Sequence, residues 1–196
     1  MKGKRSGNKQ IIIFMKTYVL TSFLIMSLPL FAQNVDVINP VKEIGVKNWS
    51  IVNDNVMGGV SSSTMYINED GNLIFNGEVS LDNNGGFASC RLDIKKVNLK
   101  DVKSFKIRVK GDGKTYKFRF SESYRSTNYS SNFETKNGIW LDIEIPLKNL
   151  KPTFMGYYSR SSPKLKIENM KSMGFLISDK QKGEFNLEIM FVQAIY

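Results

Sequence analysis

Apolar and polar residues alternate along much of the chain after residue 70. The alternation is clearest in six stretches, which read NLIFNGEVSL, SFKIRVKG, TYKFRFSE, IWLDIEIP, SMGFLISD and EFNLEIMFVQAIY. In the second stretch, for example, Lys106 and Arg108 separate Phe105, Ile107 and Val109. Because successive side chains of a strand point to opposite faces of a sheet, a period of two is typical of strands with one buried and one solvated face. The pattern therefore predicts a protein built from β-strands.

Short polar stretches that contain glycine separate the predicted strands. They read EDGN, DNNGG, GDGK, TKNG and KQKG, and glycine near Asn or Asp is typical of tight turns. No stretch has the 3.6-residue period of a long amphipathic helix, although PLKNLKP and KIENMKS each fit a single helical turn. Seven to nine short strands in about 164 residues predict two packed antiparallel sheets. The expected fold class is therefore all-β, with a single antiparallel β-sandwich.

Residues 1–32 have the three parts of a secretory signal peptide. A basic segment precedes the uncharged run TYVLTSFLIMSLPLFAQ, which contains the small residue Ala32 near its end. We expect cleavage after Ala32, which leaves residues 33–196 as an exported domain, periplasmic or secreted, without a membrane span. An uncleaved anchor is one alternative, but a span needs about 20 apolar residues and this run has about 16. A mitochondrial transit peptide is the other, but such a peptide is amphipathic and rich in arginine, whereas this segment has one arginine and a continuous apolar run. The start is Met1 or Met15.

The formal net charge of the chain is +10, and basic residues in the first 32 positions supply five of these charges. The rest of the chain has 23 basic and 18 acidic residues, which predicts a mildly basic solvated surface and no nucleic-acid site. Two predicted strands carry outward basic residues. These are Lys106, Arg108, Lys117 and Arg119, and they would form one basic patch if the two strands pair.

The chain has no histidine and one cysteine, Cys90, which excludes several kinds of chemistry. Ser-His-Asp and Cys-His catalysis cannot be assembled, and a zinc site lacks its usual ligands. Cys90 cannot form an internal disulfide and is expected to be a buried thiol. We expect no catalytic residues, no cofactor and no metal site, although Asp54 or Asp179 could offer oxygen ligands to a structural cation.

Two blocks that contain paired glycines read WSIVNDNVMGGVSSS and GEVSLDNNGGFASCR. Both resemble the signature of the complex I intermediate-associated protein 30 family. The matching positions of the first block are Trp49, Asn53, Asp54, Val56, Met57, Gly58, Gly59, Val60 and Ser61. The matching positions of the second block are Gly77, Val79, Ser80, Leu81, Asn84, Gly85, Gly86, Phe87, Ala88, Ser89 and Arg91. IWLDIEIPLKNLKPTFMG and SMGFLISDKQKGEFNLEI are also similar to that family, so the resemblance covers residues 47 to 195.

The resemblance implies a fold and a type of function. The implied fold is a galactose-binding-like β-sandwich, or jelly roll. Mitochondrial members of the family are assembly factors for NADH:ubiquinone oxidoreductase, and the resemblance implies no catalytic residue. We therefore predict a non-enzymatic exported domain that binds a protein partner or acts as an assembly factor or chaperone. A carbohydrate-binding module is the alternative function, which analogy of fold favours.

Residues of the two blocks are the candidates for binding a protein partner. They are Asn53, Asp54, Met57, Gly58, Gly59, Ser61, Gly85, Gly86, Phe87, Ser89 and Arg91. Two interpretations of the glycines stay open, because glycine serves both special backbone conformations and recognition loops. The side chain of Met57, between Val56 and glycine, is interpreted as filling the core. The loop that contains Met57, with Arg91 nearby, is also the candidate patch for a protein partner.

Two polar stretches, YRSTNYSSNF and GYYSRSS, contain the candidates for sugar binding. These candidates are Tyr124, Arg125, Tyr129, Tyr157, Tyr158 and Arg160. Aromatic faces beside Ser, Asn and Arg can bind sugars or proteins. The competing interpretation is that the tyrosines are partly buried at the bases of loops.

Overall fold

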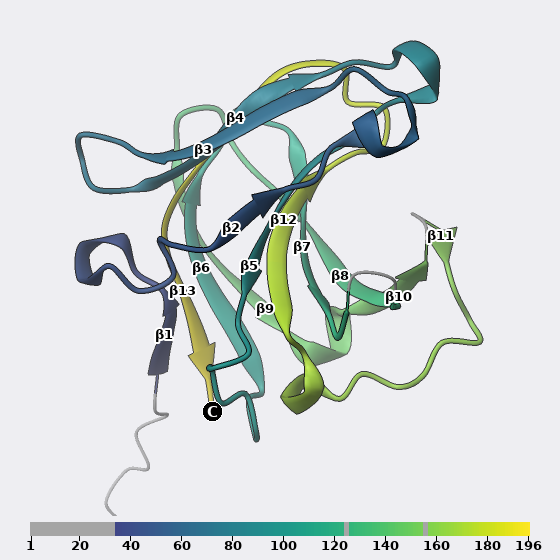
Figure 1. Ribbon diagram of the computed structural model, residues 1–196. Helices are drawn as coiled ribbons and strands as arrows, with labels where there is room; N and C mark the ends of the chain where they lie inside the picture. The colour runs from purple at the N-terminus through teal and green to yellow at the C-terminus, as the bar shows by residue number, and fades with distance from the viewer. Residues whose placement is uncertain (1–33, 124–125, 155–156) are drawn as a thin grey trace, which may run out of the picture. The chain divides into compact units, whose positions relative to one another are not determined.

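The computed structural model describes residues 34–123, 126–154 and 157–196, which belong to one compact unit. Its strands form two antiparallel sheets that enclose one apolar core (Figure 1). The predicted antiparallel β-sandwich is therefore confirmed. The signal peptide predicted for residues 1–32 lies outside the described residues.

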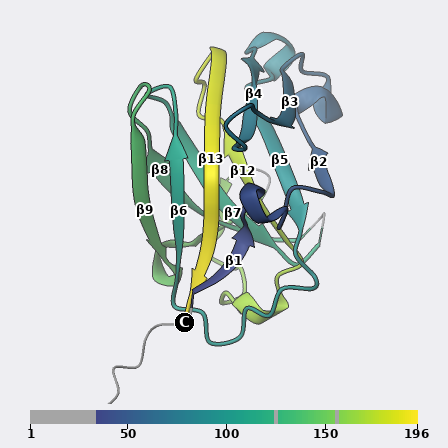
Figure 2. The same ribbon diagram turned by 90° about the vertical axis from the view of Figure 1, so that its left-hand side faces the viewer.

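One sheet has six strands, with the order β3-β4-β13-β6-β9 and with β1 paired to β13. The bounds of its strands are β1 Asn34–Ile38, β3 Ser62–Ile67, β4 Leu73–Val79, β6 Ser104–Lys110, β9 Trp140–Pro146 and β13 Gly183–Ile195. The long strand β13 pairs with β4 through its first half and with β6 and β1 through its second half (Figure 2). β13 therefore joins the two ends of this sheet.

The other sheet has seven strands in the order β11-β10-β8-β7-β12-β5-β2. The bounds of its strands are β2 Trp49–Ile51, β5 Ala88–Asp93, β7 Thr115–Ser121, β8 Asn128–Glu134, β10 Lys151–Phe154, β11 Tyr157–Tyr158 and β12 Ser172–Ile177. The thirteen strands of the described residues exceed the predicted seven to nine, because β1, β2, β10 and β11 have five residues or fewer. Strands this short have too few positions to show a period of two.

Short 3-10 helices lie between some of the strands. Their bounds are η1 Pro40–Lys42, η2 Asp54–Met57, η3 Asp82–Asn84, η4 Leu147–Asn149 and η5 Ile167–Asn169. The predicted helical turns in PLKNLKP and KIENMKS correspond to η4 and η5. Within the described ranges, no helix is long and apolar enough to cross a membrane.

The core lies between the two sheets and contains most of the apolar half of the alternating stretches. Ile139 is the exception in IWLDIEIP, since it is 52% exposed, and in EFNLEIMFVQAIY a bulge after Ile189 places Val192 and Ala194 in the core instead of Phe191. Phe105 of β6 contacts Phe118 and Phe120 of β7, with ring centroids 5.6 and 4.7 Å apart, so the two sheets meet through aromatic side chains. Cys90 is also fully buried, and burial raises the pKa of its thiol to about 12. The expected buried, unreactive thiol is therefore confirmed.

The predicted basic patch does not form, because its residues lie in different sheets. Lys106 and Arg108 belong to β6, whereas Lys117 and Arg119 belong to β7, which pairs with β8 and β12. Arg108 lies 3.3 Å from Asp142 on the neighbouring strand β9. Arg119 is buried, although its position between two core phenylalanines places it on the outer face of its sheet. The alternation correctly predicted that Arg119 lies on the outer face of its sheet, but it did not predict that the side chain is buried there.

Candidate functional site

The carboxylate of Asp54 joins the two glycine blocks. Asp54 begins η2, directly after β2, and its side chain has no exposed surface. Its Oδ1 accepts a hydrogen bond from Ser61 N at 2.9 Å, and its Oδ2 accepts one from Ser61 Oγ at 2.5 Å. The second block contributes Gly86 N at 2.7 Å and Phe87 N at 3.3 Å, both of which donate to Oδ2. One buried carboxylate therefore holds both blocks in place.

The environment of Asp54 keeps its carboxyl group ionised at neutral pH. Burial acts to raise its pKa, but the hydrogen bonds from Ser61, Gly86 and Phe87 outweigh burial and lower the pKa below its ordinary value. These donors occupy the oxygens that a structural cation would need. Asp179, the other residue considered as a cation ligand, forms an ion pair with Lys117 at 2.7 Å. Within the described residues, no three or more His, Cys, Asp or Glu side chains gather as metal ligands.

The paired glycines are explained by the space and the backbone conformation around Asp54. A Cβ at Gly59 would overlap the carboxyl group of Asp54, and one at Gly85 would lie 2.6 Å from its Oδ2. Gly58 and Gly86 adopt φ angles of +89° and +135°, which side chains disfavour. This geometry favours the conformational interpretation of the glycines.

Several polar candidates of the two blocks are buried within this network. Asn53 Oδ1 accepts hydrogen bonds from Ser63 Oγ at 2.8 Å and from Ser89 N at 3.3 Å. The hydroxyl of Ser89 donates to the carbonyl oxygen of Val52. Like Asp54 and Ser61, Asn53 and Ser89 are buried. We conclude that these four buried residues hold the two glycine blocks in their conformation and have little surface with which to contact a partner.

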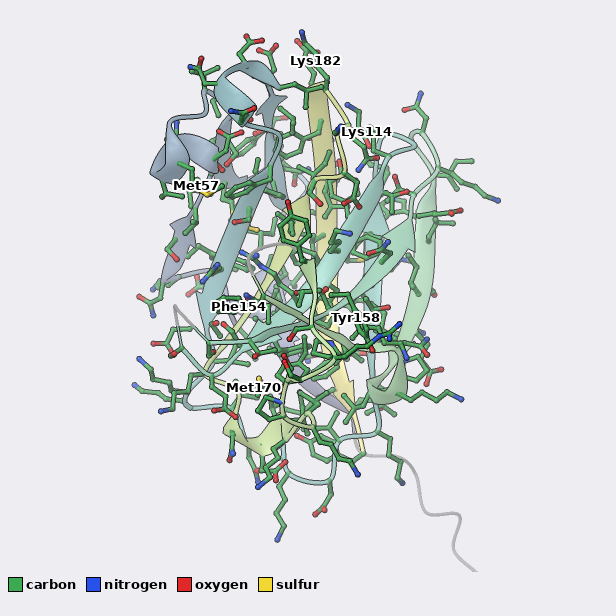
Figure 3. The ribbon with its side chains drawn as sticks, turned by 90° about the vertical axis from the view of Figure 1, so that its right-hand side faces the viewer. Met57, Lys114, Phe154, Tyr158, Met170 and Lys182 are labelled. Carbon is green, nitrogen blue, oxygen red and sulfur yellow. The ribbon has the colours of Figure 1, made fainter. Side chains whose placement is uncertain are left out.

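The apolar residues between the buried anchors point to solvent. Val56, Met57 and Val60 are 60%, 70% and 53% exposed, and we call these three residues the loop tip. The interpretation of Met57 as a core residue is therefore wrong, because the turn η2 that Asp54 anchors directs its side chain outward (Figure 3). Arg91 belongs to a different surface, since it lies on β5 in register with Ser50 of β2.

The sugar-binding candidates separate into two groups in the structure. Tyr157 and Tyr158 of β11 are 80% and 61% exposed. With Arg160 they belong to an open pocket of about 530 Å³, whose lining residues are Phe154, Tyr157, Tyr158, Ser159, Arg160 and Ser161. Tyr129 is buried in β8, where its hydroxyl donates to Pro163 O at 2.8 Å, so the interpretation of Tyr129 as a sugar ligand is wrong. Tyr124 and Arg125 lie outside the described residues.

Sequence reasoning missed Phe154 as a partner of the exposed tyrosines. Phe154 is the last residue of β10 and pairs with Tyr157 of β11. Its side chain is exposed, and β10 and β11 form the edge of the seven-stranded sheet next to β8 (Figure 1). The stretch PTFMGYY around Phe154 has no alternation that could have indicated an exposed aromatic strand.

Arg119 was also missed as a candidate for binding, and the structure places it beside Arg91 on the outer sheet face. Gly174 of β12 is paired with Arg91 on one side and with Arg119 on the other. Nη2 of Arg119 donates to Ser89 Oγ at 3.0 Å, so this arginine also contacts the second glycine block. Burial, and after it the positive charge of Arg91, lower the pKa of Arg119 to about 9.

The two packed antiparallel sheets define the fold class of this protein as a β-sandwich. A family 11 carbohydrate-binding module of a cellulosomal cellulase from Clostridium thermocellum has a similar fold, with 14% identity, a TM-score of 0.62, and coverage of 84% of this chain and 95% of that chain. A family 29 carbohydrate-binding module matches 84% of this chain and 85% of its own, with 10% identity and a TM-score of 0.52. At these identities the likeness shows the fold alone.

Comparison of sequences identifies the family within this class. The family model described as complex I intermediate-associated protein 30 matches residues 39–189, and the chain belongs to this family. A probable mitochondrial complex I intermediate-associated protein 30 of Caenorhabditis elegans is 22% identical over 155 residues, which are 68% of this chain and 46% of the relative. The chain therefore spans about half the length of that relative. The resemblance seen in the two glycine blocks is confirmed.

Proposed function

We propose that this chain is a non-enzymatic binding domain that holds a protein partner through the loop tip. The exposure of Val56, Met57 and Val60 on a loop with a buried polar base is the observation that carries the proposal. Exposed apolar side chains gathered on one loop favour contact with a protein, and methionine adapts its shape to a partner. Because hydrogen bonds to Asp54 already order the loop, binding loses little conformational entropy.

Membership of the family supports a role in assembly rather than in catalysis. The matching relative from Caenorhabditis elegans carries a name that refers to complex I intermediates. In this chain the buried acid of the signature, Asp54, accepts four hydrogen bonds, which suits a structural group better than a catalytic one. The proposal is therefore an assembly factor or chaperone whose partner is a protein.

Export is part of the proposal and rests on the sequence of residues 1–32. A basic segment, an apolar run and Ala32 support cleavage by a signal peptidase. The protein partner would then lie in the periplasm or outside the cell. We expect the mature protein to begin at Gln33, which N-terminal sequencing of protein from the extracytoplasmic fraction measures. Recovery of the protein only from the cytoplasm, with its first residues intact, would contradict export.

Site-specific crosslinking tests the contact of the loop tip with a partner. A photoreactive amino acid at position 57 should crosslink one specific protein in intact cells, because Met57 projects from the anchored loop. The matched control places the same group at Val41, which is 79% exposed and is the middle residue of η1, outside both glycine blocks in the sequence. Recovery of the same protein from both positions would refute a contact through the loop tip.

A triple substitution tests the energetic role of the same residues. Changing Val56, Met57 and Val60 to serine should reduce crosslinking from a neighbouring exposed position, Asn55, by at least tenfold. Since all three side chains are exposed, the unfolding midpoint should change little. Undiminished crosslinking in this variant would show that the apolar side chains do not bind the partner.

A carbohydrate-binding module is the second candidate function, and the exposed hairpin favours it. Tyr157 and Tyr158 present aromatic surface beside Phe154 and Arg160, as sites for sugar rings do. Changing Tyr157 and Tyr158 together to alanine should then abolish binding of whichever oligosaccharide the protein retains on a glycan array. Binding that survives this change would exclude the hairpin as the sugar site.

A further inference from the structure

The outer face of the seven-stranded sheet is polar along two adjacent rows that cross its strands. In one row lie Ser50, Arg91, Gly174, Arg119, Ser130 and Lys151. In the next lie Asp93, Ser172, Ser121, Asn128, Thr153 and Tyr158. Neither row contains an aliphatic side chain, and the second ends at an exposed tyrosine of β11. Hydroxyl and amide groups beside an aromatic ring suit a sugar better than the apolar centre of a protein interface.

Arg119 occupies the middle of this face with few protein partners. A guanidinium group has five N–H donors, and within the described part of the chain one of them forms a hydrogen bond, from Nη2 to Ser89 Oγ. No carboxylate of the described residues lies within ion-pair distance of Arg119. The neighbouring cation on β7, Lys117, does have such a partner in Asp179 at 2.7 Å. Arg119 is therefore a buried cation, and the described residues occupy only a small part of its fork-shaped set of donors.

Gly174 leaves a gap between the two arginines. Strands in a sheet lie about 4.8 Å apart, so the backbones of Arg91 and Arg119 are about 10 Å apart, with Gly174 between them. Backbone of β5 approaches Gly174 too closely for a Cβ, and the position therefore carries no side chain. Two guanidinium groups on either side of such a gap can bind one oxyanion from both sides.

We propose that the outer face of the seven-stranded sheet binds an acidic carbohydrate, with Arg119 and Arg91 as the site for its carboxylate or sulfate group. The side chains of Ser50, Asn128 and Thr153, which keep exposed surface within the two rows, would bind the sugar hydroxyls, and Tyr158 would contact a neighbouring ring. An anion at Arg119 supplies a negative charge that no carboxylate of the described residues provides within ion-pair distance, in a place where little water screens it. The inference rests on the second candidate function and is independent of the loop tip.

Calorimetric titration with matched sugars tests the acidic group. Trigalacturonate should bind the mature protein at least tenfold more tightly than its carboxyl-reduced counterpart, at an ionic strength of about 0.15 M. A sulfated galactose oligosaccharide distinguishes sulfate from carboxylate, and hexaglutamate distinguishes a sugar from an acidic peptide. Equal binding of the acid and its reduced form would overturn the anion site but leave a carbohydrate function standing. Binding of no oligosaccharide would refute both, and tighter binding of hexaglutamate would assign the face to an acidic peptide instead.

Arg119→Met separates a binding role from a structural one. This variant should lose at least tenfold in affinity for the acidic oligosaccharide, and its unliganded Tm should rise by about 2–4 °C. The rise is expected because the change removes a buried charge that Arg91 repels, while Ser89 keeps its hydrogen bond to Val52. A Tm below that of the wild type, or unchanged affinity, would overturn the proposal.

Two further arginine variants complete the test. Arg108→Met makes the same chemical change on the six-stranded sheet, where Arg108 is partly exposed and paired with Asp142. It should leave affinity for the acidic sugar within twofold of the wild type. Arg119→Lys keeps the charge but loses the planar fork, so its affinity should fall between those of the wild type and Arg119→Met. A loss in Arg108→Met as large as in Arg119→Met would show that net charge alone attracts the ligand.

Discussion

Replacing Asp54 by asparagine tests whether one carboxylate holds the two glycine blocks together. The substitution preserves the shape of the side chain but replaces one oxygen by an NH2 group. If the NH2 group takes the place of Oδ1, it faces the backbone N–H of Ser61, which then has no acceptor. If it takes the place of Oδ2, it faces the N–H groups of Gly86 and Phe87. In both orientations a buried donor meets another donor.

The expected loss of stability follows from these contacts. In the better orientation one backbone N–H is left unsatisfied, which costs about 1–3 kcal/mol. The three hydrogen bonds to Oδ2 survive with a neutral acceptor, and each weakens by about 1 kcal/mol. The free energy of unfolding should therefore fall by about 4–6 kcal/mol, a large part of the roughly 5–15 kcal/mol typical of a domain.

Urea denaturation followed by tryptophan fluorescence measures this loss. The chain has two tryptophans, and Trp49 lies in β2, immediately before the affected loop. Asp82→Asn is the matched control, because Asp82 is exposed in η3 and should change the free energy of unfolding by less than about 0.5 kcal/mol. A loss below about 1 kcal/mol for Asp54→Asn would refute the anchoring role.

The pH dependence of the same two proteins gives a second check. Burial acts to raise the pKa of Asp54, but the hydrogen bonds to its carboxylate lower this pKa by more than burial raises it. The net result is a pKa below the ordinary value of 3.8. A group with a lowered folded pKa stabilises the protein fully above its unfolded pKa, and this contribution disappears as the pH falls through the folded pKa. The stability difference between wild type and Asp54→Asn should therefore stay constant from pH 7 to about 5 and shrink below 3.8. A difference that grows in acid would contradict this sign.

Two further substitutions test the local geometry. Gly59→Val should lower the free energy of unfolding by about 2 kcal/mol or more, because its side chain would overlap the carboxyl group of Asp54. Gly58→Ala is the comparison, since nothing lies within 4 Å of its Cβ and only its positive φ, about 1–2 kcal/mol, opposes the change. Tyr129→Phe removes the hydrogen bond to Pro163 O, so its free energy of unfolding in urea denaturation should fall by about 1 kcal/mol. The variant should bind any oligosaccharide as tightly as the wild type does. A larger effect of Gly58→Ala than of Gly59→Val, or weaker sugar binding by Tyr129→Phe, would show that these contacts are misassigned.

The sequence by itself determined the longer strands, the sandwich and the family. Alternation is a local property, since each residue pair along a strand already shows which side chains share a face. It correctly placed Phe105, Ile107 and Val109 in the core. The absence of histidine can be read directly from the sequence. The glycine blocks that resemble the family are also contiguous stretches of sequence, which need no structure to be recognised.

Only the tertiary structure decided which of the candidate residues are accessible. The strands of Lys106 and Lys117 follow each other in the chain yet lie in different sheets, because pairing depends on hydrogen bonds to strands far away in sequence. The burial of Asp54 depends on donors from Gly86 and Phe87, more than thirty positions later. The position of Arg119 beside Arg91 likewise requires β12 between their strands. A pattern within one strand carries no record of its neighbours, and the neighbours determine which polar groups are buried and which surfaces can bind.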